Sequence, residues 1–402
     1  MKKYNKNSIR IISSNITSRL GNSVFDYANQ MLISRLFPNS LIFIGIYQSS
    51  EQIIGIIFNL FAGALADNIN RKKMLILTDV LSGLVCLLGF AFLPSEYVYF
   101  VLIIGNILLA MIHTFNLPIY NAIVKESIEE SYIEKHISYF SIFKESTKVI
   151  APLAGLIIWS YFGIYFAYIF NAITFFVSAL ISMKITKINE TSIIEKNKKK
   201  NIFIQIKEGL VYIYNNNAIK KLLIISSGIN FFLSAYNLLL PYLDQYYEKE
   251  LTGFYGMALI IQSMGAVIFS FINTKILNDK DKNGITENKM ILSLFLLGIS
   301  ISTITFLDFL NVIYLKLLPY LLVGGFLTLF NIQFFSIVQK VTSNEYIGRV
   351  YSVIFTISIL FMPLGSMIFG KILSIDNLFG MLISGLGIIF SVIIYFIYNT
   401  KI

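Results

Sequence analysis

The chain has 402 residues, of which 56% are hydrophobic and only 13% are charged, and its mean hydropathy is +0.72. Soluble domains carry about a quarter charged residues, so this composition excludes an ordinary soluble protein. A formal net charge of +10 could indicate a nucleic-acid partner. Positive residues also mark the cytoplasmic loops of a membrane protein, so the position of each cation along the chain decides between the two explanations.

Apolar runs of about 20 residues recur along the chain, and a helix of that length crosses roughly 30 Å of hydrocarbon. The runs are continuous rather than alternating, which favours helices over a membrane β-barrel. The sequence therefore predicts an all-α membrane protein with twelve transmembrane helices. The predicted spans are 11–36, 41–66, 74–93, 98–123, 138–160, 163–184, 221–243, 254–277, 289–310, 313–338, 348–372 and 378–398.

Most lysines and arginines fall in alternate loops, and positive loops are retained in the cytoplasm. This distribution places both termini in the cytoplasm and predicts a multi-pass protein of the plasma membrane, surrounded by the lipid bilayer. Because the basic residues report topology, no nucleic-acid partner is expected. No cofactor and no metal site are expected, and the lone Cys86 has no second cysteine with which to pair.

A polar stripe runs along the first predicted helix and recurs in the seventh, with its members three and four residues apart. Such a stripe is expected where a helix faces a water-filled cavity. The fourth and tenth predicted helices also carry polar side chains at equivalent positions, so we expect a substrate cavity between two halves. Interhelical hydrogen bonding is the alternative for any single residue. The predicted cavity residues are Asn22, Asp26, Asn29, His113, Asn116, Tyr120, Asn230, Asn237 and Asn331.

Asp26 and Glu51 are carboxylates inside predicted helices, where a charge costs about 2.5–3.5 kcal/mol at the helix centre. A carboxylate that meets apolar surroundings and water in turn can bind and release a proton. The hypothesis is that one of the two couples proton entry to substrate exit. The alternatives are an ion pair between Asp26 and Arg19, and a hydrogen-bonded packing role for Glu51.

A lysine-rich stretch divides the chain into an N-terminal bundle (1–184), a cytoplasmic linker (185–219) and a C-terminal bundle (220–402). The end of the linker has apolar residues at helical spacing, which predicts either a short helix along the inner membrane surface or an extension of the seventh span. The halves look like copies, since the same interval separates Ser141 from Pro152 and Ser352 from Pro363. This repetition predicts two pseudo-symmetric six-helix bundles.

Charges are concentrated in the stretch GALADNINRKKM, Gly63 to Met74. It resembles the signature loop of the major facilitator superfamily, Gly-x-Leu-Ala-Asp followed by a turn and Arg-Lys, and the resemblance extends across nearly the whole chain. It implies the major facilitator fold, in which this loop clamps the start of the eleventh helix. Asn70 replaces the glycine of the family and is expected to tolerate a left-handed turn. The implied gating residues are Gly63, Asp67, Arg71, Lys72, Gly348 and Arg349, with Pro152 and Gly155 bending the fifth helix.

Three stretches look like the bacterial macrolide-efflux-like exporters of that superfamily: SRLGNSVFDYA, KEGLVYIYNNNAIKKLLI and YIGRVYSVIF. This resemblance implies a monomeric secondary active transporter of a bacterial cell membrane, not an enzyme. It would export amphiphilic small molecules, drug or macrolide-like, against an inflow of protons by alternating access, and so confer antibiotic resistance. Two alternatives stay open: an importer of a nutrient or siderophore-like compound on the same fold, and a membrane sensor or anchor that transports nothing.

Overall fold

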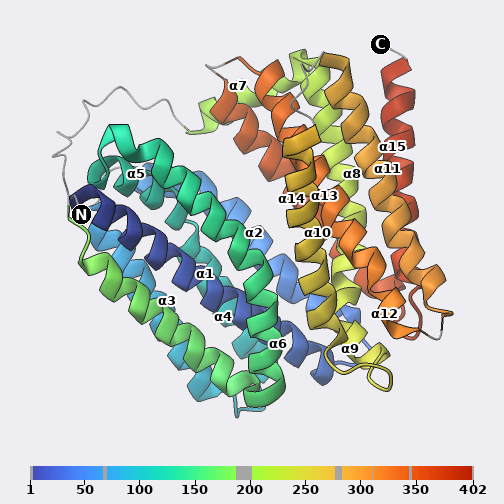
Figure 1. Ribbon diagram of the computed structural model, residues 1–402, viewed down its shortest axis with the longest axis horizontal. Helices are drawn as coiled ribbons and strands as arrows, with labels where there is room; N and C mark the ends of the chain where they lie inside the picture. Colours follow the sequence, from blue (N-terminus) through green and yellow to red (C-terminus); the bar gives the residue numbers. More distant parts are fainter. Residues whose placement is uncertain are drawn as a thin grey trace. The chain divides into compact units, whose positions relative to one another are not determined.

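The computed structural model describes residues 3–66, 70–186, 202–276, 283–310, 312–343 and 346–400, and the regular structure within these ranges is helical (Figure 1). The helices are α1 (Lys3–Leu36), α2 (Leu41–Ala66), α3 (Arg71–Phe92), α4 (Val98–His113), α5 (Asn116–Ser127), α6 (Glu130–Met183), α7 (Ile202–Asn215), α8 (Asn217–Leu239), η1 (Leu240–Tyr242), α9 (Leu243–Tyr246), α10 (Phe254–Ile276), α11 (Asn283–Leu307), α12 (Ile313–Lys316), α13 (Leu318–Val341), α14 (Ile347–Ile372) and α15 (Phe379–Thr400).

Within the described ranges, nine helical segments are long and apolar enough to cross a membrane, and α4 is a shorter apolar helix. The longest segment, Lys135–Met183, has 49 residues, about twice what one crossing needs. It covers two of the predicted spans, which are joined at Gly163 with φ 70° and ψ −169°. That conformation suits glycine because it lacks a Cβ. The predicted span 98–123 is instead divided between α4 and α5.

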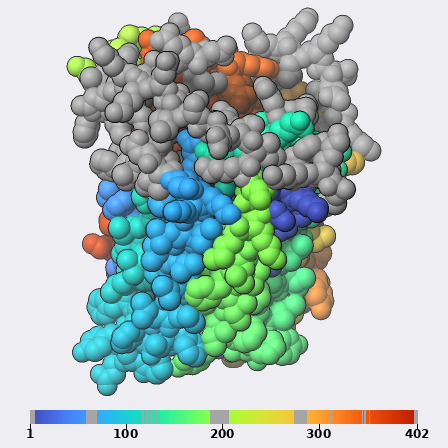
Figure 2. Space-filling model, turned by 90° about the vertical axis from the view of Figure 1, so that its left-hand side faces the viewer, coloured from blue at the N-terminus to red at the C-terminus, as the bar shows by residue number. Residues whose placement is uncertain are grey.

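The chain forms two compact units. Unit 1 comprises Met1–Ile33 and Ser50–Lys199, and unit 2 comprises Ser34–Ser49 and Lys200–Ile402. In unit 1, α3 runs beside the second half of α6, as the blue and green helices of Figure 2 show. Small residues permit this contact, since a Cβ added to Gly83 would lie 2.8 Å from the ring of Phe176. Small residues at helix contacts are typical of membrane bundles, where dispersion rather than hydrophobicity drives packing.

Asparagine side chains cap the first turns of α3 and α8, and these caps test the expectations for Asn70 and for the end of the linker. Asn70 does not adopt a left-handed turn, because its φ is −64°; it caps α3 by accepting a hydrogen bond from the Lys73 backbone N–H at 3.2 Å. The expectation of a left-handed turn was wrong, since capping satisfies a free amide without positive φ. Asn216 is extended and caps α8, so α7 is a separate helix rather than an extension of the next span.

In unit 2, α10 and α13 cross at two glycines. A Cβ added to Gly324 would lie 1.8 Å from the carbonyl oxygen of Gln262, and one added to Gly265 would lie 1.9 Å from that of Leu321. Both obstacles are backbone atoms, which a rotamer change cannot move away. The two helices are therefore held at a separation that only glycine permits at these positions.

Replacing Gly324 by alanine should lower the free energy of unfolding by about 1–3 kcal/mol, because the added methyl group forces the helices apart. Thermal unfolding of the purified protein in detergent measures the change. Gly105→Ala is the matched control, since nothing lies within 4 Å of a Cβ at Gly105 in α4. Equal melting temperatures for the two variants would contradict the close crossing.

Candidate functional site

A cavity of about 720 Å³ lies within unit 1, among α1, α4, α5 and α6. Its wall combines amide, hydroxyl, imidazole and cationic side chains with apolar and aromatic ones. The lining residues are Asn15, Ser18, Arg19, Asn22, His113, Asn116, Tyr120, Val124, Ile133, His136, Ile137, Phe140 and Lys144. Four residues predicted to line a cavity therefore meet in this one: Asn22, His113, Asn116 and Tyr120.

The polar stripe of α1 forms one side of this cavity because Asn15, Arg19 and Asn22 are one helical turn apart. Arg19 donates from Nε to Asn15 Oδ1 at 2.6 Å. Asn22 Nδ2 lies 3.4 Å from His113 Nε2, and Asn22 Oδ1 accepts from Asn171 at 3.3 Å. The side chains of α1 thus hold one another and the facing helices in place.

His136 of α6 was not predicted, yet it is fully buried and joins three helices. Its Nδ1 lies 2.8 Å from Ser8 Oγ of α1, and its Nε2 lies 3.0 Å from Tyr120 Oη of α5. A neutral imidazole has one donor and one acceptor, so it can satisfy both hydroxyls at once. Ser8 is 128 residues from His136 and Tyr120 is 16 residues away on a different helix, so no pattern along one helix indicated these contacts.

Asp26 and Glu51 lie close enough to interact electrostatically. Asp26 is partly buried and Glu51 is exposed. The alternative of an ion pair between Asp26 and Arg19 is not observed, since Arg19 donates to Asn15 and forms no ion pair with any described residue. Unit 1 therefore contains two neighbouring carboxylates that Arg19 does not neutralise.

Asp79 of α3 is a third carboxylate inside a predicted span, and it was not among the predicted site residues. It is only 4% exposed and accepts a hydrogen bond from Ser178 Oγ at 2.6 Å. Ser178 in turn contacts Ser14 Oγ at 2.7 Å, so the network joins α3, α6 and α1. Its position inside the predicted span 74–93 could have identified it, because a carboxylate in a membrane helix is costly.

Several predicted cavity residues lie elsewhere. Asn29 is fully buried beside Tyr168 in unit 1. In unit 2, Asn230 and Asn237 are partly buried and Asn331 is exposed; the backbone carbonyl of Asn237 accepts a hydrogen bond from Gln48 Nε2 at 3.2 Å. These four residues do not line the cavity of unit 1, and their role stays a prediction.

Each unit holds one predicted gating cation in an ion pair. Arg71, at the start of α3, pairs with Glu126 of α5, and Arg349, near the start of α14, pairs with Glu208 of α7 at 3.0 Å. Lys72 Nζ donates to the carbonyl oxygen of Met183 at 2.6 Å. Both arginines and Lys72 therefore fasten the first turn of a helix to another element of the same unit.

Of the other predicted gating residues, the structure describes the surroundings of Pro152 and Gly155. Asp67 lies outside the described residues, and so do the surroundings of Gly63 in α2 and Gly348 in α14. Pro152 lies inside α6, partly buried. Gly155 packs against α1, since an added Cβ would lie 2.9 Å from the Tyr27 ring.

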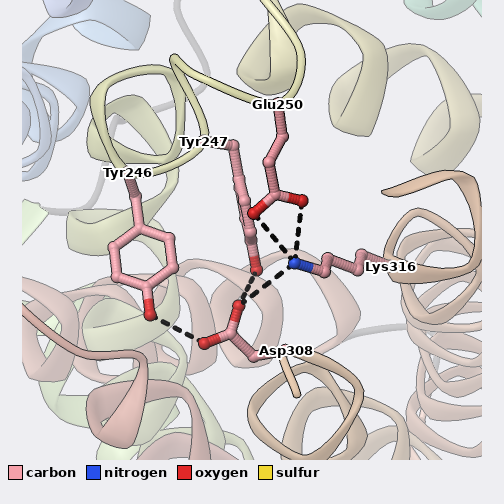
Figure 3. A network of polar contacts seen from close by, with 5 residues as sticks. All are labelled: Tyr246, Tyr247, Glu250, Asp308 and Lys316. Carbon is pink, nitrogen blue, oxygen red and sulfur yellow. Dashed lines mark hydrogen bonds and ion pairs between the residues drawn. The ribbon is translucent and has the colours of Figure 1, made fainter. Parts of the chain in front are cut away.

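Unit 2 contains a network of charges and phenols that the sequence reasoning did not find (Figure 3). Asp308, just after α11, accepts hydrogen bonds from Tyr246 and Tyr247, each at 2.7 Å. Lys316 of α12 is 5% exposed; its Nζ lies 3.0 Å from Glu250 and 3.8 Å from Asp308. The network therefore ties the α9–α10 connection to the α11–α12 connection.

Tyr247 contributes to this network in two ways. Burial, together with its hydrogen bond to Asp308, raises the pKa of Tyr247 well above the ordinary phenol value, so its hydroxyl stays a donor at any physiological pH. The Lys316 ammonium also lies 4.8 Å from the centre of the Tyr247 ring, within the range of a cation–π contact. One aromatic side chain thus stabilises both the anion and the cation.

Comparison with known proteins identifies the chain's relatives. Residues 11–366 match the family model described as Major Facilitator Superfamily. A relative in Bacillus subtilis (strain 168), the uncharacterized MFS-type transporter YfiS, is 22% identical over 368 residues, or 90% of this chain and 85% of that protein.

Solved structures share the fold. The crystal structure of the nucleoside transporter NupG has a TM-score of 0.74 at 14% identity, covering 98% of this chain and 99% of its own. A bacterial homologue of the iron transporter ferroportin, in an inward-facing state, has a TM-score of 0.71 at 14% identity, covering 99% of both chains. The POT family transporter PepTSo has a TM-score of 0.68 at 13% identity, covering 100% of this chain and 99% of its own.

Proposed function

The chain belongs to the major facilitator superfamily and is a multi-pass membrane transporter, not an enzyme; from that premise we propose that it is a proton-coupled exporter of amphiphilic small molecules. We further propose twelve spans in two six-helix bundles, a bacterial plasma-membrane location with cytoplasmic termini, and a monomeric state. Membership of the macrolide-efflux branch stays a prediction.

The cavity of unit 1 is the observation that carries the proposal. Its volume of about 720 Å³ lies within the roughly 300–1,000 Å³ of sites for drug-sized ligands. Polar side chains of α1 face apolar and aromatic side chains of α5 and α6, including Tyr120, Ile137 and Phe140. A wall of this kind suits a ligand that has both a polar group and an apolar body.

Proton coupling is proposed for Asp26 and Glu51 because they interact with each other. Two close carboxylates repel when both are ionised, and binding one proton removes that repulsion. Glu51 is exposed at the surface of unit 1, and we propose that water reaches the pair there. A proton that binds and leaves this pair during the transport cycle would couple the proton gradient to cargo export.

Gating is proposed for the ion-paired first turns of α3 and α14. The pairs Arg71–Glu126 and Arg349–Glu208 are the contacts that a change of conformation at these helix starts would break or re-form. By sequence, Asp67 falls between α2 and α3, and Lys72 lies in the first turn of α3.

The test is dye efflux from a pump-deficient bacterial host that expresses the full chain, with a panel of amphiphilic fluorescent dyes. An exporter lowers the accumulation of at least one dye, and a protonophore abolishes the difference. Asp67→Asn, which removes the carboxylate proposed for the gate, is the control variant and should express normally without pumping. Uptake driven by the gradient would instead indicate an importer, and the absence of any flux would favour a sensor or anchor.

A further inference from the structure

The charged side chains that line the cavity of unit 1 in the described part of the chain are all positive. Among the described residues that line it are two cations, Arg19 of α1 and Lys144 of α6, and no carboxylate. Both side chains are exposed rather than packed into the helix bundle. Cations inside a membrane protein are costly unless something compensates them.

Neither cation forms an ion pair with a described residue, and the one acid that attracts Lys144 is Glu145, which is itself paired with Lys148. Arg19 and Lys144 interact unfavourably with each other. The nearest acid in the sequence of α6, Glu145, is bound to Lys148 at 2.7 Å. The balance of charge in this cavity is therefore left to whatever occupies it.

The guanidinium of Arg19 is positioned to receive an anion. Its Nε is held by Asn15 Oδ1 at 2.6 Å, which fixes the plane of the group. The remaining N–H donors of a guanidinium can bind a carboxylate, sulfonate or phosphate through two parallel hydrogen bonds. Lys144 adds a second point of positive charge on the facing helix.

The rest of the cavity favours an apolar body on the ligand. Val124, Ile133, Ile137 and Phe140 line it together with the ring of Tyr120. Apolar and aromatic walls with a few placed polar groups are typical of sites that bind small organic ligands. A bare inorganic anion would leave these walls without contacts.

We infer that the cargo is an amphiphilic anion, whose acidic group binds between Arg19 and Lys144 and whose apolar body packs on α5 and α6. This inference rests on the proposed function, since it assigns the substrate class of the same cavity. Anionic lipid headgroups share this chemistry, so the test separates a small soluble anion from a lipid.

The experiment measures binding of two xanthene dyes of opposite charge, fluorescein (anionic) and rhodamine 123 (cationic), to the purified full chain in phosphatidylcholine nanodiscs. Arg19→Gln and Lys144→Gln remove one charge each, and Arg19→Lys keeps the charge. Lys148→Gln is the matched control, because that lysine is on the same helix, pairs with Glu145 and does not line the cavity.

Wild-type protein should bind fluorescein at least about tenfold more tightly than rhodamine 123, and each Gln variant should weaken fluorescein about tenfold or more. Lys148→Gln should leave both affinities unchanged, and Arg19→Lys should recover part of the loss. Rhodamine 123 binding and the melting temperature report whether each variant is folded.

Three results would overturn the inference: no saturable fluorescein binding, equal affinity for both dyes, or an affinity that both Gln variants leave within about twofold. Competition by phosphatidylglycerol in the nanodisc would overturn the assignment to a soluble cargo. The two proposals fail separately: efflux of rhodamine 123 alone ends the anion inference, whereas charge-dependent fluorescein binding without any flux ends the transport proposal.

Discussion

Replacing Asp308 by leucine should lower the free energy of unfolding by about 3–5 kcal/mol, because it removes the carboxylate shared by two phenol hydroxyls and the buried Lys316. The hydroxyls of Tyr246 and Tyr247 would both lose their acceptor. Lys316, at 5% exposure, would keep only the contact with Glu250, a residue 44% exposed at its side chain. Denaturant unfolding of the purified protein measures the loss.

Asp308→Asn is the graded control, because its amide oxygen still accepts a phenol hydrogen bond; its expected cost is about 1–2 kcal/mol. A double-mutant cycle with Tyr247→Phe should show a coupling energy between the two positions. The single Trp159 lies in unit 1, beside the cluster that includes Val24 and Ala28, so its fluorescence follows unit 1 separately. A cost below about 1 kcal/mol for the leucine variant would mean that the network adds little to stability.

The double variant Asp26→Asn, Glu51→Gln should abolish proton-driven efflux, reducing it to the rate of protein-free vesicles. An amide cannot carry a proton through the cycle, and removal of both carboxylates prevents one from substituting for the other. Proteoliposomes with an imposed pH gradient measure dye efflux and proton movement together. Downhill exchange of dye should persist, because the amides keep the polar character of the site.

Asp79→Asn is the matched control for proton coupling. It removes another carboxylate of unit 1, one that accepts a hydrogen bond from Ser178. We expect it to retain substrate-induced proton movement. Full coupling in the double variant, or its loss in Asp79→Asn alone, would move the proton path away from Asp26 and Glu51.

Periodicity along single helices was sufficient to predict part of this molecule. The run lengths indicated apolar membrane helices, and the spacing of Asn15, Arg19 and Asn22 placed them on one face, where they line a cavity with His113 and Asn116. These inferences depend only on the 3.6-residue repeat and on the cost of polar groups in lipid.

Contacts between distant parts of the chain could not be predicted in the same way. Ser8 contacts His136, and Tyr246 contacts Asp308; the members of each pair lie in different elements of the chain and follow no common spacing. Hydropathy separated the spans 138–160 and 163–184, but it did not indicate that a break at the single residue Gly163 joins them. A single positive φ at a glycine leaves little trace in hydropathy.

The buried state of Cys86 has a practical consequence. It is the single cysteine of the chain, 0% exposed, with Asn171 Nδ2 at 3.5 Å from its sulfur, and a thiol shielded in this way is inert to aqueous reagents. The unmodified protein should therefore not react with aqueous maleimide reagents. Cysteines introduced one at a time at Asn22, Asn116, Asn237 and Asn331 can then be scored for solvent access with the native thiol left in place.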